Sequence, residues 1–250
     1  MNKSRHFDHL LLFVVIALMG VGLIMVYSAS SVTSLATMSD AHYYLKRQFM
    51  WVVVGLLAMF GVSHFPYQRL EKAAVPLLGV AIFFLILVLV PGVARDIGGA
   101  KRWIRFGGLG FQPSEFSKLC FVIYMAHSIS LRQDRIRNFL HGMLPDMLVA
   151  GIIFILIYKE PNLSTAALIG GTYLCMYFLG NGSLRNLGGL AAGGAVLITA
   201  LIFQAGYRMR RFWAFIDPWE NARTSGYHII QSLVAIGSGG FWGLGLGQSR

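Results

Sequence analysis

Seven mostly apolar stretches, each 12 to 19 residues long, limit what this chain can fold into more than any other feature. A helix needs roughly 20 apolar residues to cross about 30 Å of hydrocarbon. The fifth stretch is short and needs residues 143–146 to reach across. The pattern predicts an all-α integral membrane protein, a polytopic helical bundle with about seven spans in this chain. The stretches are Leu10–Tyr27, Phe49–Phe65, Ala73–Val90, Phe116–Leu131, Met147–Tyr158, Leu163–Leu179 and Leu187–Ala205.

The composition agrees with a membrane protein. Of the 250 residues, 56% are hydrophobic and 12% charged, against roughly 45–50% and about 25% in soluble domains. These values exclude a disordered tail, a coiled coil and a disulfide scaffold, and they argue against an ordinary soluble enzyme. Cys120 and Cys175 both lie in apolar stretches, which favours inert core thiols. The histidine spacing predicts no metal site, no cofactor is indicated, and dependence on a divalent cation stays open.

The net charge of +11 is unevenly distributed. If the N-terminus is cytoplasmic, the outer loops carry more Lys and Arg than the inner ones, the reverse of the positive-inside rule. Residues 95–105 and 208–223 hold four cations each and account for the excess. Either the N-terminus lies outside, or these charges serve a function. We favour the second reading, in which both loops form a basic surface for an anionic lipid or phosphate-bearing substrate rather than for nucleic acid.

Two motifs precede the middle of the chain. In Gly99–Arg105, cations beside Trp103 suit a phosphate at the membrane interface, and the alternative is a belt of snorkelling side chains. In Gln112–Lys118, Pro113 fits the first helical position, and Glu115 and Lys118 are three residues apart on one helix face. A charged pair at membrane depth should face protein or a wet cavity. It predicts either a cavity for a polar headgroup or a structural ion pair.

The segment Arg208–Glu220 gathers cations, aromatic residues and two carboxylates after the seventh stretch. Cations can neutralise a diphosphate leaving group, and a carboxylate can act as general base on a hydroxyl. The alternative is an interfacial helix that ends in an Asp217-Pro218 turn. Beyond it, Tyr227–Ile236 has the pattern of a short amphipathic helix. Earlier in the chain, Asn162 is predicted to cap a helix. Asp146 is predicted to be a first-turn acid that the helix dipole stabilises.

In their order along the chain, these segments resemble the SEDS family of FtsW, RodA and SpoVE proteins. Asp217-Pro218-Trp219 and Gly245–Ser249 are more similar to the FtsW and SpoVE branch than to RodA. The motifs that carry the resemblance are Gly99-Ala100-Lys101-Arg102-Trp103, Gln112-Pro113-Ser114-Glu115 with Lys118, Glu160-Pro161-Asn162-Leu163, Asp217-Pro218-Trp219, Gly226–Ser232, Gly237–Gly240 and Gly243-Leu244-Gly245.

The resemblance implies one SEDS-type membrane domain over residues 1–250, within a protein of about ten spans that continues beyond Arg250. It implies a cytoplasmic N-terminus in the bacterial plasma membrane and an extracytoplasmic loop at 206–236. The implied activity is a peptidoglycan glycosyltransferase that polymerises lipid II at the outer face during cell division or sporulation. The implied partners are a class B penicillin-binding protein and proteins of the division or elongation complex.

The resemblance also suggests site residues. The family's acid usually lies four residues after the position of Asp217, where this chain has Asn221, and an amide cannot be a general base. We therefore rank Asp217 first and Glu220 second as the carboxylate that acts as general base. The family often has Asp where Asn162 stands. The substrate-binding candidates are Arg102, Arg105, Gln112, Glu115, Lys118, Arg210, Arg211, Tyr227, Gln231 and Ser232.

The reaction expected from this set is an inverting glycosyl transfer. A carboxylate takes the proton of an acceptor sugar hydroxyl, the hydroxyl attacks the anomeric carbon, and undecaprenyl diphosphate leaves. Arg102, Arg105, Arg210 and Arg211 would stabilise the leaving group. Two other hypotheses stay open at this point: a lipid II flippase that uses the Glu115–Lys118 pair, and a non-catalytic scaffold of the cell-wall machinery.

Overall fold

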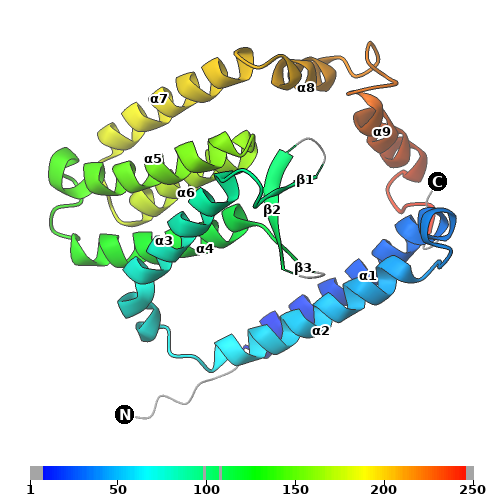
Figure 1. Cartoon of the computed structure of the whole chain (residues 1–250), viewed down its shortest axis with the longest axis horizontal. Helices are drawn as coiled ribbons and strands as arrows, with labels where there is room; N and C mark the ends of the chain where they lie inside the picture. Colours follow the sequence, from blue (N-terminus) through cyan, green and yellow to red (C-terminus); the bar gives the residue numbers. More distant parts are fainter. Residues whose placement is uncertain (1–7, 98–99, 107–108, 246–250) are drawn as a thin grey trace. The chain divides into compact units, whose positions relative to one another are not determined.

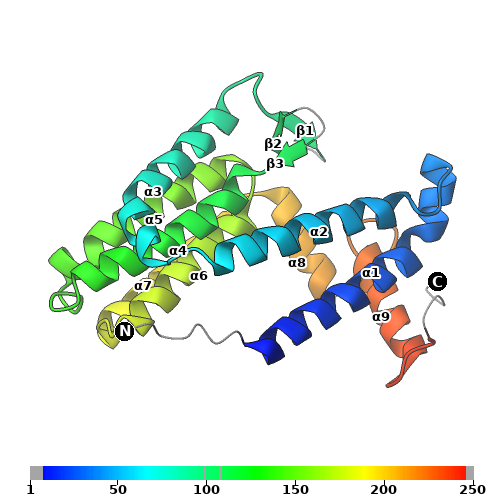
Figure 2. The same cartoon turned by 90° about the horizontal axis from the view of Figure 1, so that it is seen from below.

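The computed structural model describes residues 8–97, 100–106 and 109–245. The chain divides into two compact units, residues 1–65 with 207–250 (unit 1) and residues 66–206 (unit 2). The elements are α1 (His9–Met38), α2 (Tyr43–Ser63), α3 (Gln68–Leu89), β1 (Arg95–Ile97), β2 (Ala100–Phe106), β3 (Leu109–Phe111), α4 (Pro113–Leu131), the π-helix η1 (Phe139–Met143), α5 (Leu144–Lys159), α6 (Leu163–Leu179), α7 (Leu184–Phe203), α8 (Gly206–Ile216) and α9 (Tyr227–Gly239) (Figures 1 and 2).

Each of the seven apolar stretches lies on one helix from α1 to α7, with at most two residues beyond a helix end. Five helical segments in the described ranges are long and apolar enough to cross a membrane: α1, α2, α3, η1 with α5, and α7. The helix α6 has only 17 residues, and α4 begins with polar side chains. The structure therefore confirms a multi-helix membrane protein.

In unit 1, α1 and α2 form a helical hairpin whose turn is fixed by polar contacts. Asp8 caps α1 by accepting the Leu11 N–H at 2.9 Å. The Ser34 hydroxyl donates to the Asp40 carbonyl oxygen, and Lys46 pairs with the Asp40 carboxylate at 2.9 Å. These contacts close the turn and set the antiparallel course of both helices.

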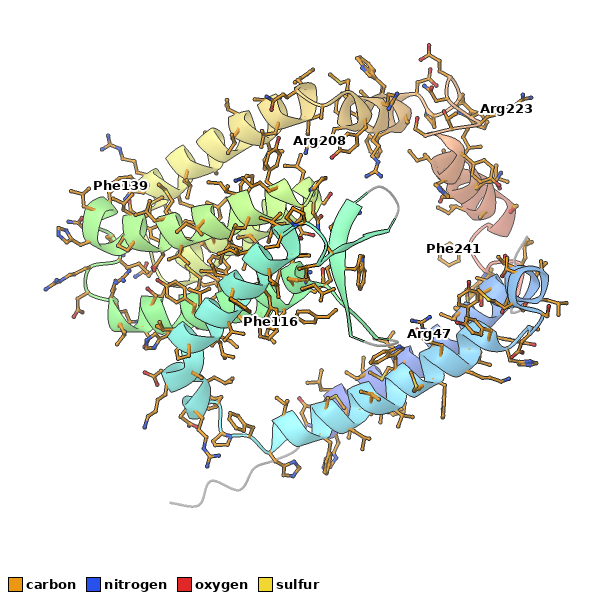
Figure 3. The ribbon with its side chains drawn as sticks, in the orientation of Figure 1. Arg47, Phe116, Phe139, Arg208, Arg223 and Phe241 are labelled. Atoms are coloured by element: carbon orange, nitrogen blue, oxygen red, sulfur yellow. The ribbon has the colours of Figure 1, made fainter. Side chains whose placement is uncertain are left out.

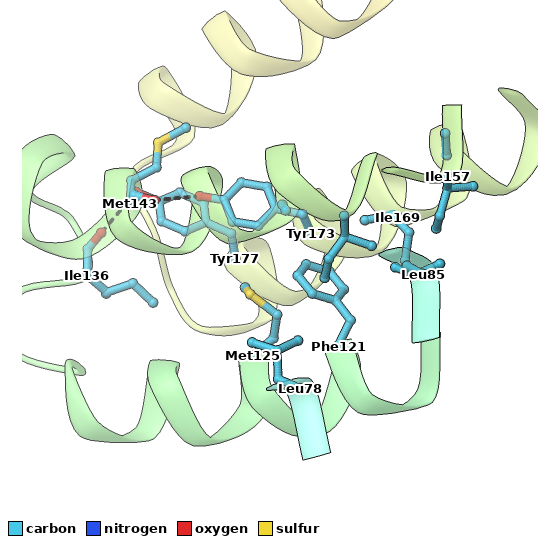
Figure 4. Close-up of a cluster of buried hydrophobic side chains, with 13 residues drawn as sticks. Leu78, Leu85, Phe121, Met125, Ile136, Met143, Ile157, Ile169, Tyr173 and Tyr177 are labelled. Carbon is cyan, nitrogen blue, oxygen red and sulfur yellow. Dashed lines mark hydrogen bonds between the residues drawn. The ribbon is translucent and has the colours of Figure 1, made fainter. Parts of the chain in front are cut away.

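Unit 2 has a buried core between α3, α4, α5 and α6. Leu85, Phe121, Ile153 and Ile169 are fully buried there. The ring of Tyr173 stacks on that of Tyr177, and both hydroxyls donate to backbone carbonyl oxygens of the segment that joins α4 to α5 (Figure 4). The core thus holds the α4–α5 connection as well as the helices. Cys120 is buried as expected, but Cys175 is exposed on α6, so the expectation of two core thiols is wrong for Cys175.

A three-stranded antiparallel sheet, β1-β2-β3, corrects the purely α-helical prediction. Alternation within β2 places Arg102 and Ile104 on one face, and Ile104 is buried. Rings from three elements hold the sheet: Phe111 of β3 contacts Phe84 of α3 and Phe116 of α4, at centroid distances of 5.3 and 6.0 Å. Figure 3 shows Phe116 on α4. The short strands were missed because charges and glycines interrupt the alternation.

Because α4 and α5 run in opposite directions, the segments between the helices of unit 2 lie at two opposite ends. The sheet leads directly into the start of α4, and α5 runs back so that the Glu160–Asn162 turn lies at the same end. We call this the sheet end. The connector 132–143, which joins α4 to α5, lies at the opposite end (Figures 1 and 2).

The Tyr177 hydroxyl offers a direct test of how the connector is held. Replacing Tyr177 by Phe removes the donor to the Ile136 carbonyl, 2.9 Å away, and leaves that buried oxygen without its partner. We expect a loss of about 1–3 kcal/mol of stability, measured as a lower melting temperature in detergent. The control is Tyr67→Phe, because the Tyr67 side chain is largely exposed. Equal melting temperatures for both variants would contradict this account.

Candidate functional site

The start of α4 places three predicted residues at the sheet end of unit 2. Pro113 occupies the first turn, and Gln112 precedes it without capping the helix by its side chain, as predicted. Instead the Gln112 amide donates to the Ser114 hydroxyl at 3.0 Å. Ser114 and Ser117 are fully buried, and the Ser117 hydroxyl donates to the Ser114 carbonyl. The first turn of α4 is therefore polar inside as well as outside.

The predicted Glu115–Lys118 ion pair forms with an N–O distance of 2.8 Å. Its surroundings differ from the expectation of an enclosed site, because the Glu115 side chain is 56% exposed and that of Lys118 29% within unit 2. The pair is thus open on one side. A polar ligand could contact Glu115 without displacing protein.

Arg102 of β2 and Glu160 form an incomplete polar site at the same end. Glu160 is buried, and within the described ranges both of its carboxylate oxygens and the Arg102 Nε lack hydrogen-bond partners. Glu160 follows the last residue of the candidate span that ends at Lys159. Burial raises the pKa of the Glu160 carboxyl to about 8, and the charge of Arg102 opposes this rise. Buried polar atoms are nearly always hydrogen-bonded, so these unpaired atoms mark a place where a ligand or water could bind.

Sequence reasoning missed Glu160, although a carboxylate directly after an apolar run was visible. Its neighbour Asn162 caps α6 as predicted by accepting the Thr165 N–H at 3.3 Å. Asp146 is more than the predicted first-turn acid. It is buried, and it accepts hydrogen bonds from Ser128 and Arg132 at 2.6 and 3.1 Å. The side chain of Arg105 lies outside the described residues.

In unit 1, α8 and the turn after it carry the predicted cations and acids. Arg210 and Arg211 are exposed on α8, and no ion pair of either occurs in the described part of the chain. Asp217 follows the helix directly, and its Oδ1 accepts the N–H groups of Trp219 and Glu220 at 3.1 and 3.4 Å. This is the predicted Asp217-Pro218 turn at the end of a helix. It also holds the carboxylate of Asp217 in one orientation.

The turn from Asp217 to Gly226 folds back on itself. Residues 219–224 line a recess of about 400 Å³, which includes Glu220 and Asn221. The Asn221 carbonyl accepts the N–H groups of Thr224 and Gly226, each at 3.0 Å. A side chain at Gly226 would overlap the Pro218 carbonyl oxygen. The two candidate acids and Asn221 therefore share one compact loop whose closure requires glycine at 226.

The helix α9 follows this loop and contains Tyr227–Ile236, the segment predicted to form a short amphipathic helix. Tyr227 and Gln231 are exposed and four residues apart, so they share one face. The Ser232 hydroxyl already donates to the His228 carbonyl at 2.8 Å, and it is therefore less available to a ligand. The structure thus groups Arg102, Gln112, Glu115 and Lys118 in unit 2, and Arg210, Arg211, Asp217, Glu220, Tyr227, Gln231 and Ser232 in unit 1. Within the described ranges, no group of three His, Cys, Asp or Glu residues could hold a metal ion.

The family described as cell cycle protein, comprising FtsW, RodA and SpoVE, matches residues 8–250. The chain belongs to this family. Among curated members, probable peptidoglycan glycosyltransferase FtsW of Trichlorobacter lovleyi is 39% identical and FtsW of Geobacter sp. strain M18 36%, over 99% and 100% of the chain. Stage V sporulation protein E of Bacillus subtilis is 36% identical over the whole chain. The chain covers 65–68% of these three family members.

Solved structures of family members have the same fold. A peptidoglycan synthase complex that coordinates polymerisation and crosslinking contains a chain 29% identical, with a TM-score of 0.74 over 95% of this chain and 67% of that one. RodA of Thermus thermophilus is 29% identical with a TM-score of 0.55, over 71% of this chain and 57% of RodA. The family fold therefore covers both units.

The loop from Asp217 to Gly226 provides a prediction about its own closure. Replacing Gly226 by Ala introduces a Cβ that overlaps the Pro218 carbonyl, so the loop must open. We expect faster proteolytic cleavage within residues 217–226. The matched control is Gly237→Ala in α9, where the Cβ meets no atom within 4 Å. Cleavage at the control's rate would refute the closed loop.

The buried Glu160 predicts a pH dependence of stability. In the unfolded chain this carboxyl titrates near 4.5, and in the folded chain its pKa is about 8. Between these values the folded state holds a proton that the unfolded state has lost, so stability falls as pH rises from about 4.5 to 8.

Glu160→Gln removes this contribution. We expect its melting temperature to exceed that of the unmodified protein above pH 8 and the difference to disappear near pH 4.5. Because each pKa unit corresponds to about 1.4 kcal/mol, the effect amounts to several degrees. The control is Glu220→Gln in the exposed turn. A constant difference at all pH values would contradict the shifted pKa.

Proposed function

We propose that this chain is part of a peptidoglycan glycosyltransferase that polymerises lipid II at the outer face of the plasma membrane. The observation that carries the proposal is the family match over residues 8–250, together with curated relatives named as this enzyme. The peptidoglycan synthase complex among the similar structures supports a penicillin-binding protein as partner. A role in cell division or sporulation follows from the FtsW and SpoVE relatives.

The proposed topology has seven spans in this chain, about ten in the complete protein, and a cytoplasmic N-terminus. We propose one membrane domain over residues 1–250 with an extracytoplasmic segment at 206–236. In this arrangement α1 to α7 each cross once, so the sheet end of unit 2 and residues 206–236 both lie outside. The two basic segments predicted from the sequence then face the same compartment, which is where lipid-linked disaccharides are polymerised.

We assign the general base to Asp217. Its Oδ1 is held by two backbone N–H groups, which leaves Oδ2 to accept the proton of the acceptor hydroxyl. That hydroxyl attacks the anomeric carbon, and the lipid diphosphate leaves from the opposite face, so the configuration inverts. Glu220 lies in the same loop and is the second candidate.

The arginines supply the counter-charge in this proposal. Arg210 and Arg211 are exposed on α8 next to the acid, and together with Arg102 and Arg105 they stabilise the diphosphate. Gln112, Glu115 and Lys118 bind polar groups of the lipid-linked sugar. Tyr227 and Gln231 contact the substrate from one face of α9, and Ser232 lines the neighbouring face.

A second candidate function is lipid II transport. The observation that favours it is the open Glu115–Lys118 ion pair, since charged pairs at membrane depth often mark a substrate path. Glu115→Gln separates the two functions. Loss of lipid II translocation in vesicles with unchanged polymerisation would favour the transporter. Loss of polymerisation alone would place the pair in the enzyme's substrate site.

The proposal is tested by gel-resolved polymerisation of labelled lipid II. The complete protein, purified with a cognate class B penicillin-binding protein, should produce glycan ladders. Asp217→Ala should lower turnover by at least 100-fold without unfolding the protein, because a positioned base contributes about 10²–10⁴-fold. Glu220→Gln is the matched control, and Asn221→Asp should strengthen the ladder by restoring the family's acid.

Each other outcome has a defined meaning. Turnover retained in Asp217→Ala but lost in Glu220→Gln would move the base to Glu220. The absence of any ladder from folded protein and partner would overturn the enzyme in favour of the transporter or a scaffold.

A further inference from the structure

The connector 132–143 at the end of unit 2 opposite the sheet is fixed by buried contacts. Tyr173 and Tyr177 donate to the carbonyl oxygens of Met143 and Ile136, each at 2.9 Å. Gly142 is buried so closely against the backbone of Arg135 and Ile136 that a Cβ there would overlap it. The Asn138 side chain accepts the N–H groups of Leu140 and His141. The polar side chains of the connector are therefore presented from a rigid backbone.

Two of the three arginines in the connector have partners within the protein. Arg132 pairs with the buried Asp146 at 3.1 Å. Arg137 donates to the backbone carbonyl and the side-chain oxygen of Asn181, at 3.3 and 3.2 Å. In the described ranges Arg135 has no such partner and is exposed, and the nearby Asp134 makes no ion pair. Arg135 is thus the guanidinium left for an external anion.

Arg135 lines a recess of about 290 Å³ together with Asn138 and His141. A guanidinium, a side-chain amide and an imidazole are all hydrogen-bond donors, and none of these three lining side chains is acidic. Donors around a small concave surface suit phosphate oxygens, which bind guanidinium groups through strong charge-assisted hydrogen bonds. The chemistry of this recess is therefore that of a phosphate site.

The residues beside the recess are apolar and exposed. Phe139 and Leu140, between Asn138 and His141 in sequence, are 46% and 61% exposed, and Figure 3 shows Phe139 at the outer edge of unit 2. Leu131 at the end of α4 and Leu179 at the end of α6 are exposed as well. Cations next to exposed apolar side chains at helix ends match the headgroup region of a membrane. A water-soluble phosphate ester has no acyl chains to contact these apolar side chains.

We propose that Arg135, Asn138 and His141 bind the phosphate of an anionic phospholipid, with Phe139 and Leu140 against its acyl chains. The site lies at the opposite end of unit 2 from the sheet and from Gln112, Glu115 and Lys118, and it does not depend on glycosyl transfer. Because the connector is rigid, the lipid binds at one defined place rather than as a diffuse annulus.

The test uses the complete protein in nanodiscs that contain phosphatidylglycerol and phosphatidylethanolamine. Native mass spectrometry counts the phosphatidylglycerol molecules that stay bound after release from the disc. The double variant Arg135→Gln/His141→Gln should retain about fivefold less of this lipid, the effect expected for the loss of one arginine near a membrane surface. The matched control is Arg185→Gln, which removes an exposed arginine from the start of α7 outside the recess.

A defined site is supported if Arg185→Gln retains phosphatidylglycerol within twofold of the unmodified protein and only the double variant loses it. An equal loss in both variants would overturn it in favour of diffuse charge attraction. Displacement of the lipid by millimolar glycerol 3-phosphate would instead indicate a site for soluble phosphate esters. Melting temperatures of all variants verify that the fold is intact.

Discussion

The bilayer imposes one constraint on which the rest of this structure depends: every backbone polar group within hydrocarbon must find its partner inside the protein. Helices α1 to α7 satisfy it segment by segment. Polar chemistry is then confined to the places where helices end. The sheet, the first turn of α4 and the Glu160–Asn162 turn occupy one such place, and the connector 132–143 occupies another. The functional proposals for unit 2 follow from this separation.

Helix positions were predictable from sequence because a long apolar run has few possible structures other than a helix. Caps such as Asn162 were predictable because they depend on local hydrogen bonding. The sheet was not predictable, since three-residue strands leave little periodic signal. The site was predictable in part. Residue type and position pointed to Asp217, Glu115 and Lys118 as candidates. The charge of Arg102 acts on Glu160, 58 positions away in sequence, and no local pattern reports this proximity. The burial of Asp146 was hidden for the same reason.

Asp217 and Glu160 show how carboxyl groups take different roles in different surroundings. Asp217 lies in an exposed turn where two N–H groups direct one of its oxygens. Glu160 lies in a buried turn where its charge is disfavoured and one arginine is near. A carboxylate that accepts a proton during turnover must be accessible, and Asp217 is exposed. A carboxyl group that stays protonated near neutral pH suits hydrogen-bond donation, and Glu160 fits that use better.

The hydrogen bonds of the Tyr173 and Tyr177 hydroxyls limit how far α6 can move relative to the connector. This helix starts at the capped turn beside Glu160, and through Tyr173 and Tyr177 it is fastened to both halves of the opposite connector. Hydrogen bonds of 2.9 Å tolerate little stretching. A shift of α6 along its own axis would therefore also displace the connector. The position of α6 along its axis and the conformation of the connector are thereby coupled.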